Sequence, residues 1–143
     1  MINRILVSQR LALIIEYLSE LEKLSQVNRE EFVTDKIKAG AAESFLRRSL
    51  EAIFDIGRHI LAKTGPMEMA MEYKAIAAGL AQRGIVDWEL GEKLKEMAGY
   101  RNRLVHLYNE ITNEELHQIL NGDLRDITAF VKQIRDFLTH YTP

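Results

Sequence analysis

The segment RNRLVHLY, residues 101–108, carries four side chains whose types suit chemistry at a phosphate group. Arg101 has a guanidinium that can donate two parallel hydrogen bonds to phosphate oxygens. His106 has an imidazole, and histidine, with an ordinary pKa of about 6.5, can accept and return a proton near neutral pH. Asn102 and Tyr108 add an amide and a phenol. The segment therefore combines a fixed positive charge with a group capable of acid–base catalysis.

The helix expected to carry these residues begins after Asp87 and runs to about Tyr108, and on it Arg101 falls in the middle of an apolar stripe. At about 100° per residue, the stripe is made by Leu94, Met97, Ala98, Leu104, Val105 and Tyr108. A lone buried guanidinium is costly, so Arg101 must be paired, reach solvent or face a cleft. His106 lies about 140° further round the same ideal helix. Arginine's length, a distorted last turn or a second copy of the chain would have to bring the two together.

The remaining sequence predicts an all-α antiparallel bundle of about five helices. Apolar residues recur at helical spacing and only two prolines occur. Gly57, on the apolar face of the second helix, is interpreted as a close helix contact. Thr112 and Glu115 fit a capping box, and the last helix is expected to kink or break at 121–123. The five expected helices cover Arg4–Leu24, Lys36–Lys63, Glu68–Gln82, the residues after Asp87 to about Tyr108, and Asn113 to the C-terminal end.

Composition limits the possible functions. The 143 residues are 47% hydrophobic and 28% charged, which is typical of one globular domain, here 1–143. A net charge of −2 argues against a broad cationic surface for long nucleic acid, so any phosphate site must be local. The absence of cysteine excludes disulfides and thiolate metal sites and fits a cytoplasmic protein. The four histidines lack metal-ligand spacing, and no signal peptide or membrane span is expected. We predict no metal and no cofactor.

The motif R-x-x-x-x-H-x-Y in its context resembles the signature of the HEPN superfamily, in particular HepT, the toxin half of HepT/MntA-type toxin–antitoxin pairs. A bare R-x4-H is common by chance, but three longer stretches also resemble that family in the expected order. They are EAIFDIGRHIL (51–61), LAQRGIVDWELGEKLKEMAGYRN (80–102) and VHLYNEITNEEL (105–116). The likeness covers nearly the whole chain.

The resemblance implies a HEPN-like helical bundle that forms a homodimer and cleaves RNA without a metal, with two copies of the motif lining one cleft. It implies that Arg101 and His106 are the catalytic pair and that Asn102 binds or orients the substrate. In that scheme His106 takes the proton of a ribose 2′-hydroxyl, which attacks phosphorus, while Arg101 stabilises the growing negative charge. DNA, which lacks that hydroxyl, should not be cleaved.

The resemblance also bears on regulation and on two acidic residues. It implies an MNT-type nucleotidyltransferase antitoxin that transfers AMP to Tyr108, placing phosphate beside Arg101. Glu51, Asp55 and His59 follow one polar face of the second helix, and such a row is most often solvated surface. The E-x-x-x-D-I-G pattern nevertheless resembles the family there, so Asp55, supported by Glu51, is a candidate to pair with Arg101.

Two other kinds of protein remain open at this point. One is a non-catalytic helical module that binds a nucleotide or docks a nucleotidyltransferase without cutting RNA. The other is a purely structural helical dimer, in which Arg101 bridges to a buried carboxylate and His106 is merely solvated.

Overall fold

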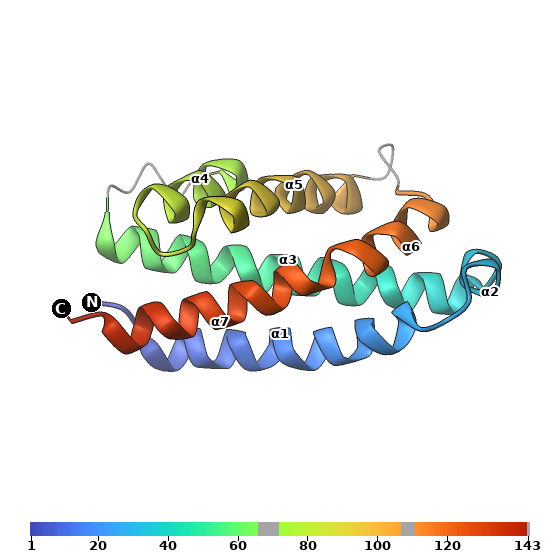
Figure 1. Cartoon of the computed structure of the whole chain (residues 1–143), viewed down its shortest axis with the longest axis horizontal. Coiled ribbons are helices and arrows are strands. Elements are labelled where there is room, and N and C mark those ends of the chain that lie inside the picture. Colours follow the sequence, from blue (N-terminus) through green and yellow to red (C-terminus); the bar gives the residue numbers. More distant parts are fainter. Residues whose placement is uncertain (66–71, 107–110, 143) are drawn as a thin grey trace.

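The structure is a computed structural model that describes residues 1–65, 72–106 and 111–142. Every regular element in these ranges is a helix, which confirms the all-α prediction (Figure 1). The elements are α1 (Arg4–Ser25), α2 (Arg29–Thr34), α3 (Lys36–Thr64), α4 (Tyr73–Gln82), α5 (Trp88–Val105), α6 (Asn113–Gly122) and α7 (Leu124–His140).

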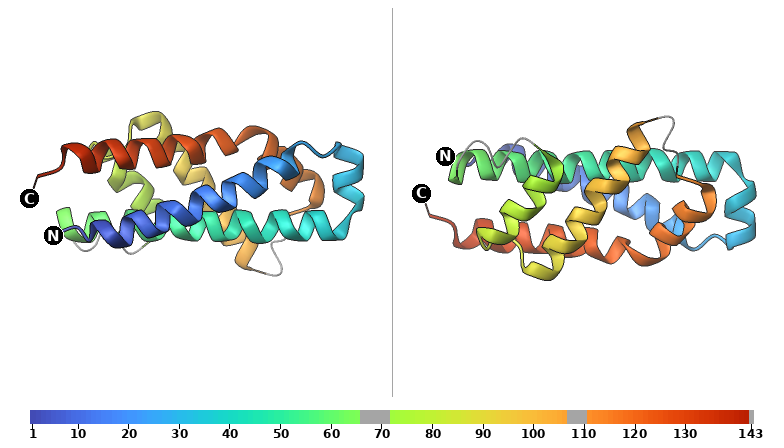
Figure 2. Two further views of the ribbon diagram at one scale, coloured as in Figure 1. Left: turned by 90° about the horizontal axis from the view of Figure 1, so that it is seen from below. Right: turned by 90° about the horizontal axis from the view of Figure 1, so that it is seen from above.

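Three long rods make up most of the bundle. α1, α3 and the consecutive helices α6 and α7 run along its long axis, while α4 and α5 form a hairpin that lies obliquely across them (Figure 1 and Figure 2). α1 packs against both α3 and α7, and α3 also packs against α4 and α5. α3 is therefore the central helix, and any site on the α4–α5 hairpin is positioned by it.

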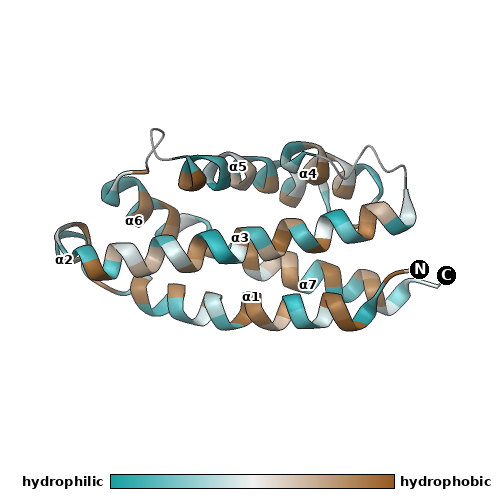
Figure 3. Cartoon of the chain, turned by 180° about the vertical axis from the view of Figure 1, so that it is seen from behind, coloured by the Kyte–Doolittle hydropathy of each residue, from teal (hydrophilic) through white to brown (hydrophobic). Residues whose placement is uncertain are grey.

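The core forms because each helix is apolar along one side. Figure 3 shows polar and apolar segments alternating along the helices, as expected when one face is buried and the other solvated. All seven described helices contribute buried apolar side chains to one cluster, and Phe32, Phe54 and Phe130 are among its largest fully buried members. Ser49 is buried too, and its hydroxyl donates to the Phe45 carbonyl at 2.8 Å, so its polar group is satisfied.

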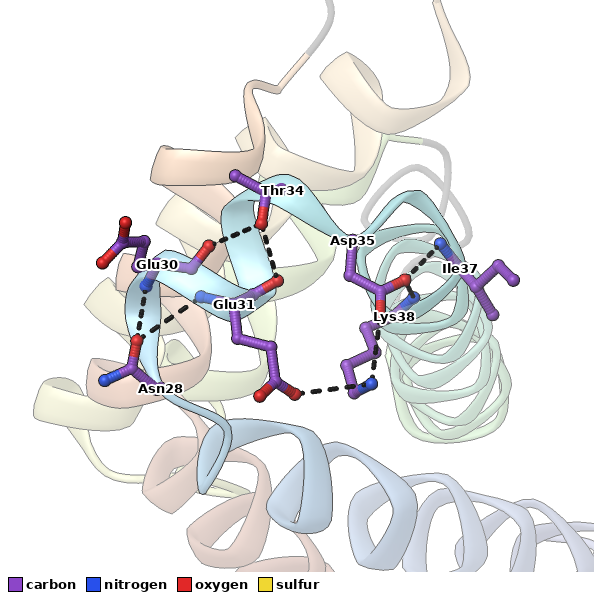
Figure 4. A network of polar contacts seen from close by, with 7 residues as sticks. All are labelled: Asn28, Glu30, Glu31, Thr34, Asp35, Ile37 and Lys38. Atoms are coloured by element: carbon purple, nitrogen blue, oxygen red, sulfur yellow. Dashed lines mark hydrogen bonds and ion pairs between the residues drawn. The ribbon is translucent and has the colours of Figure 1, made fainter.

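The described residues hold seven helices rather than about five, for two local reasons. The first is α2, which lies within a segment expected to be non-helical. At the start of α2, the Asn28 side chain accepts hydrogen bonds from the backbone N–H groups of Glu30 and Glu31. At the start of α3, the Asp35 side chain accepts hydrogen bonds from the backbone N–H groups of Ile37 and Lys38. Lys38 bridges Asp35 and Glu31 at 3.0 and 3.4 Å (Figure 4). Two successive caps thus form a short helix between the first two expected helices, where no helix was expected.

The second reason is the junction of the last two helices. Asp123 closes α6 and opens α7, so the expected interruption at 121–123 is a complete break. The predicted start of α6 is confirmed, because the Thr112 hydroxyl accepts from the backbone N–H of Glu115 at 3.1 Å.

α4 and α5 are shorter than expected. α4 begins at Tyr73, and residues 68–71 of the predicted helix lie outside the described residues. α4 ends in a turn at Gly84, whose φ of 72° suits glycine, while the N–H of Ile85 reaches back to the Leu80 carbonyl. α5 ends at Val105 rather than Tyr108, and His106 is already extended, with φ −95° and ψ 115°. The helical-wheel position of His106 therefore does not apply.

The two ends of the chain are tied together by Arg4. Its guanidinium donates to the carbonyls of Leu138 and Tyr141 at 2.8 and 2.9 Å, and the two termini lie side by side at one end of the bundle in each ribbon view (Figure 1 and Figure 2). Within the described ranges, no helix is both long enough and apolar enough to cross a bilayer.

Gly57 is the close contact that its place on the apolar face predicted. A Cβ at this position would lie 2.6 Å from Ile76 Cγ2, closer than real Cβ atoms approach a neighbour, and 3.1 Å from Leu80 Cδ1, which is also tight. The missing side chain therefore lets α4 approach α3 closely.

Replacing Gly57 with alanine should destabilise the protein by about 1–3 kcal/mol, because the added methyl forces α3 and α4 apart. Gly40, on the same helix, is exposed and a Cβ there would have nothing within 4 Å. Gly40→Ala should instead stabilise by about 0.5–1 kcal/mol through helix propensity. Urea unfolding of both variants measures this, and equal effects would contradict the role of Gly57.

Candidate active site

Arg101 lies near the end of α5 with its guanidinium over the ring of Tyr73, the first residue of α4. Its Cζ atom is 4.3 Å from the centre of that ring, close enough for attraction between the charge and the π-electrons. Its Nε is buried and makes no hydrogen bond to any described residue. Among the described carboxylates, none forms an ion pair with Arg101. An aromatic ring therefore takes the place that a buried carboxylate would have in a purely structural pairing.

Tyr73 is itself held by α3. Its ring stacks on Phe54, with the ring centres 4.8 Å apart and the planes 11° from parallel, and Phe54 is almost fully buried. Phe54 lies one turn before Gly57, and Tyr73 one turn before Ile76, so this stack and the Gly57 contact are successive contacts of one helix crossing. The close approach at Gly57 thus places a rigid aromatic surface under Arg101.

Arg101 and Asn102 line one wall of a cavity of about 510 Å³. The other described residues of its lining are Arg58, Glu72, Tyr73 and Lys74. Three cationic side chains thus face one carboxylate, and α4 begins at the same place, with the positive end of its dipole. The cavity suits an anion with several oxygen atoms.

The two acidic candidates on α3 lie elsewhere than expected. Asp55 is 3.9 Å from Arg58 and 3.9 Å from Arg10, and together these three residues line a neighbouring cavity of about 380 Å³ between α1 and α3. Glu51 is one turn further back and 3.5 Å from Arg47. Within the described part of the chain, the carboxylate of Asp55 therefore contacts a second arginine of the 510 Å³ cavity rather than Arg101 itself.

The second half of the motif follows the end of α5. His106 is exposed, and its backbone N–H donates to the Asn102 carbonyl at 3.2 Å. Asn102 is exposed as well, so both side chains can be reached from solvent. Tyr108 lies outside the described residues.

The next residue after Asn102 ties α5 to α6. Arg103 forms a two-pronged ion pair with Glu115, with Nη1–Oε2 and Nη2–Oε1 distances of 2.5 and 2.7 Å. Paired donors of this kind give direction as well as attraction. The last turn of α5 is therefore fixed to the first turn of α6, on the two sides of the segment that holds Tyr108.

Sequence reasoning missed Tyr73, Arg58 and Lys74. Tyr73 stands among mixed charged and apolar residues inside the expected helix Glu68–Gln82, where nothing in the local pattern relates it to Arg101. Arg58 carried a usable signal, because it lies three residues after Asp55 on the same polar face and within the stretch EAIFDIGRHIL that resembles the family.

Comparison with known proteins identifies the family. The family model described as Ribonuclease HepT-like matches residues 14–134. The chain belongs to this family. Among curated HepT relatives, the tRNA nuclease HepT of Aphanizomenon flos-aquae is 27% identical over 137 residues, covering 96% of this chain and 92% of that protein. The mRNA nuclease HepT of Shewanella oneidensis is 29% identical over 90 residues, or 63% of this chain and 67% of that protein.

Solved structures share the HepT-like fold. The tri-AMPylated HEPN toxin of Shewanella oneidensis, solved in complex with its MNT antitoxin, has a TM-score of 0.80 at 23% identity, covering 92% of this chain and 97% of that one. YutE of Bacillus subtilis, described as a cytosolic protein of unknown function, has a TM-score of 0.82 at 23% identity, covering 99% and 95%. The HEPN-like bundle is thereby confirmed.

His59, third in the polar row with Glu51 and Asp55, is half-buried rather than simply solvated. Its Nε2 accepts a hydrogen bond from the backbone N–H of Asn3 at 2.9 Å, and Asn3 caps α1. Burial, reinforced by the positive charges of Lys63 and the amino terminus, lowers the pKa of His59. A protonated ring could not accept this bond.

Acid should therefore weaken the protein through His59. Because its pKa is lower in the folded chain than in the unfolded chain, its contribution is present above the unfolded value and is lost as the pH falls through the folded value. His59→Gln keeps an acceptor that does not titrate. Urea unfolding between pH 7 and pH 5 should show a steeper loss of stability in the wild type than in this variant. Parallel curves would contradict the assignment.

Proposed function

We propose that this chain, as one HEPN/HepT-like domain over 1–143, is a metal-independent endoribonuclease and the toxin of a toxin–antitoxin pair. Family membership supports this proposal, as do relatives named tRNA nuclease and mRNA nuclease. The observation that carries it is the environment of Arg101, whose guanidinium lines a cationic cavity and has no ion pair with a described carboxylate. Such a charge suits an external phosphate.

His106 supplies the acid–base step in this proposal. Its imidazole removes the proton from a ribose 2′-hydroxyl, and the resulting oxygen attacks the adjacent phosphorus. Arg101 donates hydrogen bonds to the non-bridging oxygens as negative charge grows on them. The bond to the 5′ oxygen then breaks and that oxygen takes up a proton, leaving a 2′,3′-cyclic phosphate and a 5′-hydroxyl.

The remaining site residues have supporting roles. Asn102 lies beside Arg101 in the cavity lining and binds the substrate through its amide. Asp55 supports the cationic side of the site from α3 through Arg58, whereas Glu51, the other candidate for this role, pairs with Arg47 one turn away. We further propose that two copies of the chain form a homodimer in which both motifs line one cleft, as the resemblance to the HepT-like family implies.

The proposed inhibitor is an MNT-type nucleotidyltransferase that transfers AMP to Tyr108. A homologous fold has been solved as an AMPylated HEPN toxin with an MNT antitoxin. A nucleotide phosphate added close to Arg101 would compete with the RNA phosphate for the guanidinium and add repulsion against the incoming backbone.

Alanine at Arg101 or at His106 should abolish RNA cleavage. Loss of a transition-state hydrogen-bond donor costs about 10²–10³-fold in rate, and loss of a general base about 10²–10⁴-fold. The measurement is cleavage of an RNA oligonucleotide by purified protein, with EDTA present and with the matching DNA as a control. Activity should persist in EDTA, and the DNA should stay intact.

The same assay separates the other readings. Nucleotide binding without any RNA cleavage by the wild type would support a non-catalytic module instead. If Arg101→Ala alters only stability or association, the structural dimer would be favoured. Cleavage retained in His106→Ala would refute the acid–base assignment.

The regulatory proposal is tested by incubating the chain with an MNT-type nucleotidyltransferase and ATP. Mass spectrometry should show the addition of AMP to the wild type and none to Tyr108→Phe, and only the wild type should lose RNase activity. Modification of Tyr108→Phe at the wild-type level would place the modified residue elsewhere.

A further inference from the structure

The cavity beside Arg101 contains a second guanidinium that shares its aromatic support. We propose that Arg58 and Arg101, both held against Tyr73, form a two-arginine seat for consecutive RNA phosphates, in which Arg101 binds the scissile phosphate and Arg58 the adjoining one. Tyr73 is the positioning residue for Arg101, and Asp55 is the positioning residue for Arg58. The inference rests on the proposed ribonuclease function and extends its substrate site.

The first support is the shared ring. The Cζ of Arg58 is 5.5 Å from the centre of the Tyr73 ring and that of Arg101 is 4.3 Å from it, so two like charges are held close together. Attraction to the electron-rich ring partly offsets their repulsion. A polyanion that contacts both guanidiniums would offset the remaining repulsion between them.

The second support is the set of carboxylates near each arginine. Asp55 lies 3.9 Å from Arg58 and equally far from Arg10, and all three side chains are between about a third and a half exposed, so these pairs are weak and orient the arginine more than they neutralise it. Arg101 has an ion pair with no described carboxylate, and its buried Nε makes no hydrogen bond there. Among the described residues that line the cavity, cationic side chains therefore outnumber carboxylates around the ring of Tyr73.

The third support is the beginning of α4, which adds to the arginines. Glu72 precedes the helix, and its side chain makes no capping hydrogen bond. Backbone N–H groups of the first turn and the positive end of the helix dipole favour an anion there. Lys74 lines the cavity from the same turn and offsets the charge of Glu72. The two arginines and the N-terminal end of α4 therefore all face the same cavity of about 510 Å³, where each favours an anion.

A binding experiment tests Arg58 separately from catalysis. The probe is an RNA oligonucleotide with 2′-O-methyl riboses, which the proposed reaction cannot cleave, and its affinity for the full chain is measured across a range of salt concentrations. Arg58→Gln should weaken binding about tenfold at low salt, as expected for a lost charged hydrogen bond. It should also reduce the slope of log affinity against log salt by about 0.7, the value for one phosphate contact with a single strand.

The matched control is Arg29→Gln, which removes an exposed arginine on α2 at the other end of α3. It should leave both affinity and slope unchanged. Equal losses of RNA affinity in the two variants would show that only the overall charge of the protein matters, and this would overturn the proposal. An unchanged salt slope in Arg58→Gln would overturn it as well. If the wild type cleaves no RNA yet shows the Arg58-dependent slope, the ribonuclease proposal fails while the phosphate seat stands.

Kinetics with cleavable RNA tests the positioning role of Tyr73. Tyr73→Phe keeps the ring and should retain kcat, whereas Tyr73→Leu should lower kcat about tenfold by freeing Arg101. Arg58→Gln should raise KM and leave kcat nearly unchanged, because it acts on binding. A loss of kcat in Tyr73→Phe equal to that in Tyr73→Leu would overturn the role of the ring.

A spectroscopic measurement covers the case in which Tyr73→Leu does not fold. In the wild type and in Tyr73→Phe, the Nε–H resonances of Arg58 and Arg101 should both shift as inorganic phosphate is added, and that of Arg29 should not. A shift of the Arg101 resonance alone would remove Arg58 from the seat.

Discussion

The close crossing of α3 and α4 at Gly57 is the constraint on which the site depends. Because Gly57 has no side chain, Ile76 and Leu80 of α4 pack against the backbone of α3. One turn earlier along both helices, the ring of Tyr73 stacks on the ring of Phe54. The ring of Tyr73 then becomes a fixed platform for Arg101 from α5. A contact in the hydrophobic core thus determines, within a single helical turn, where the guanidinium of Arg101 lies.

Most of the helices, and the unusual position of Arg101 on an apolar helix face, could be predicted from the sequence, because periodicity and the cost of a buried charge are local properties. The end of α5 could not be predicted in this way, because the apolar spacing continues through Val105 while the backbone already leaves the helix at His106. α2 was missed because its two caps, Asn28 and Asp35, resemble ordinary loop residues. The aromatic partner of Arg101 was missed because the contact with Tyr73 arises only from tertiary packing.

Neighbouring arginines of α5 show how position decides role. Arg101 faces an aromatic ring and a cavity, whereas Arg103, two residues later, is paired with Glu115 and joins α5 to α6. Both are partly buried, and residue type alone does not separate them. What separates them is the partner, because a carboxylate satisfies the guanidinium internally and a ring leaves its hydrogen-bonding edge available.

The hydrogen bonds from Arg4 to the carbonyls of Leu138 and Tyr141 have a topological consequence. Since both termini emerge together, a short peptide could join them into a circle, and the polypeptide could be reopened at the α1–α2 turn with its helix packing kept. Anything genetically fused at either terminus would likewise project from that shared extremity, away from α2.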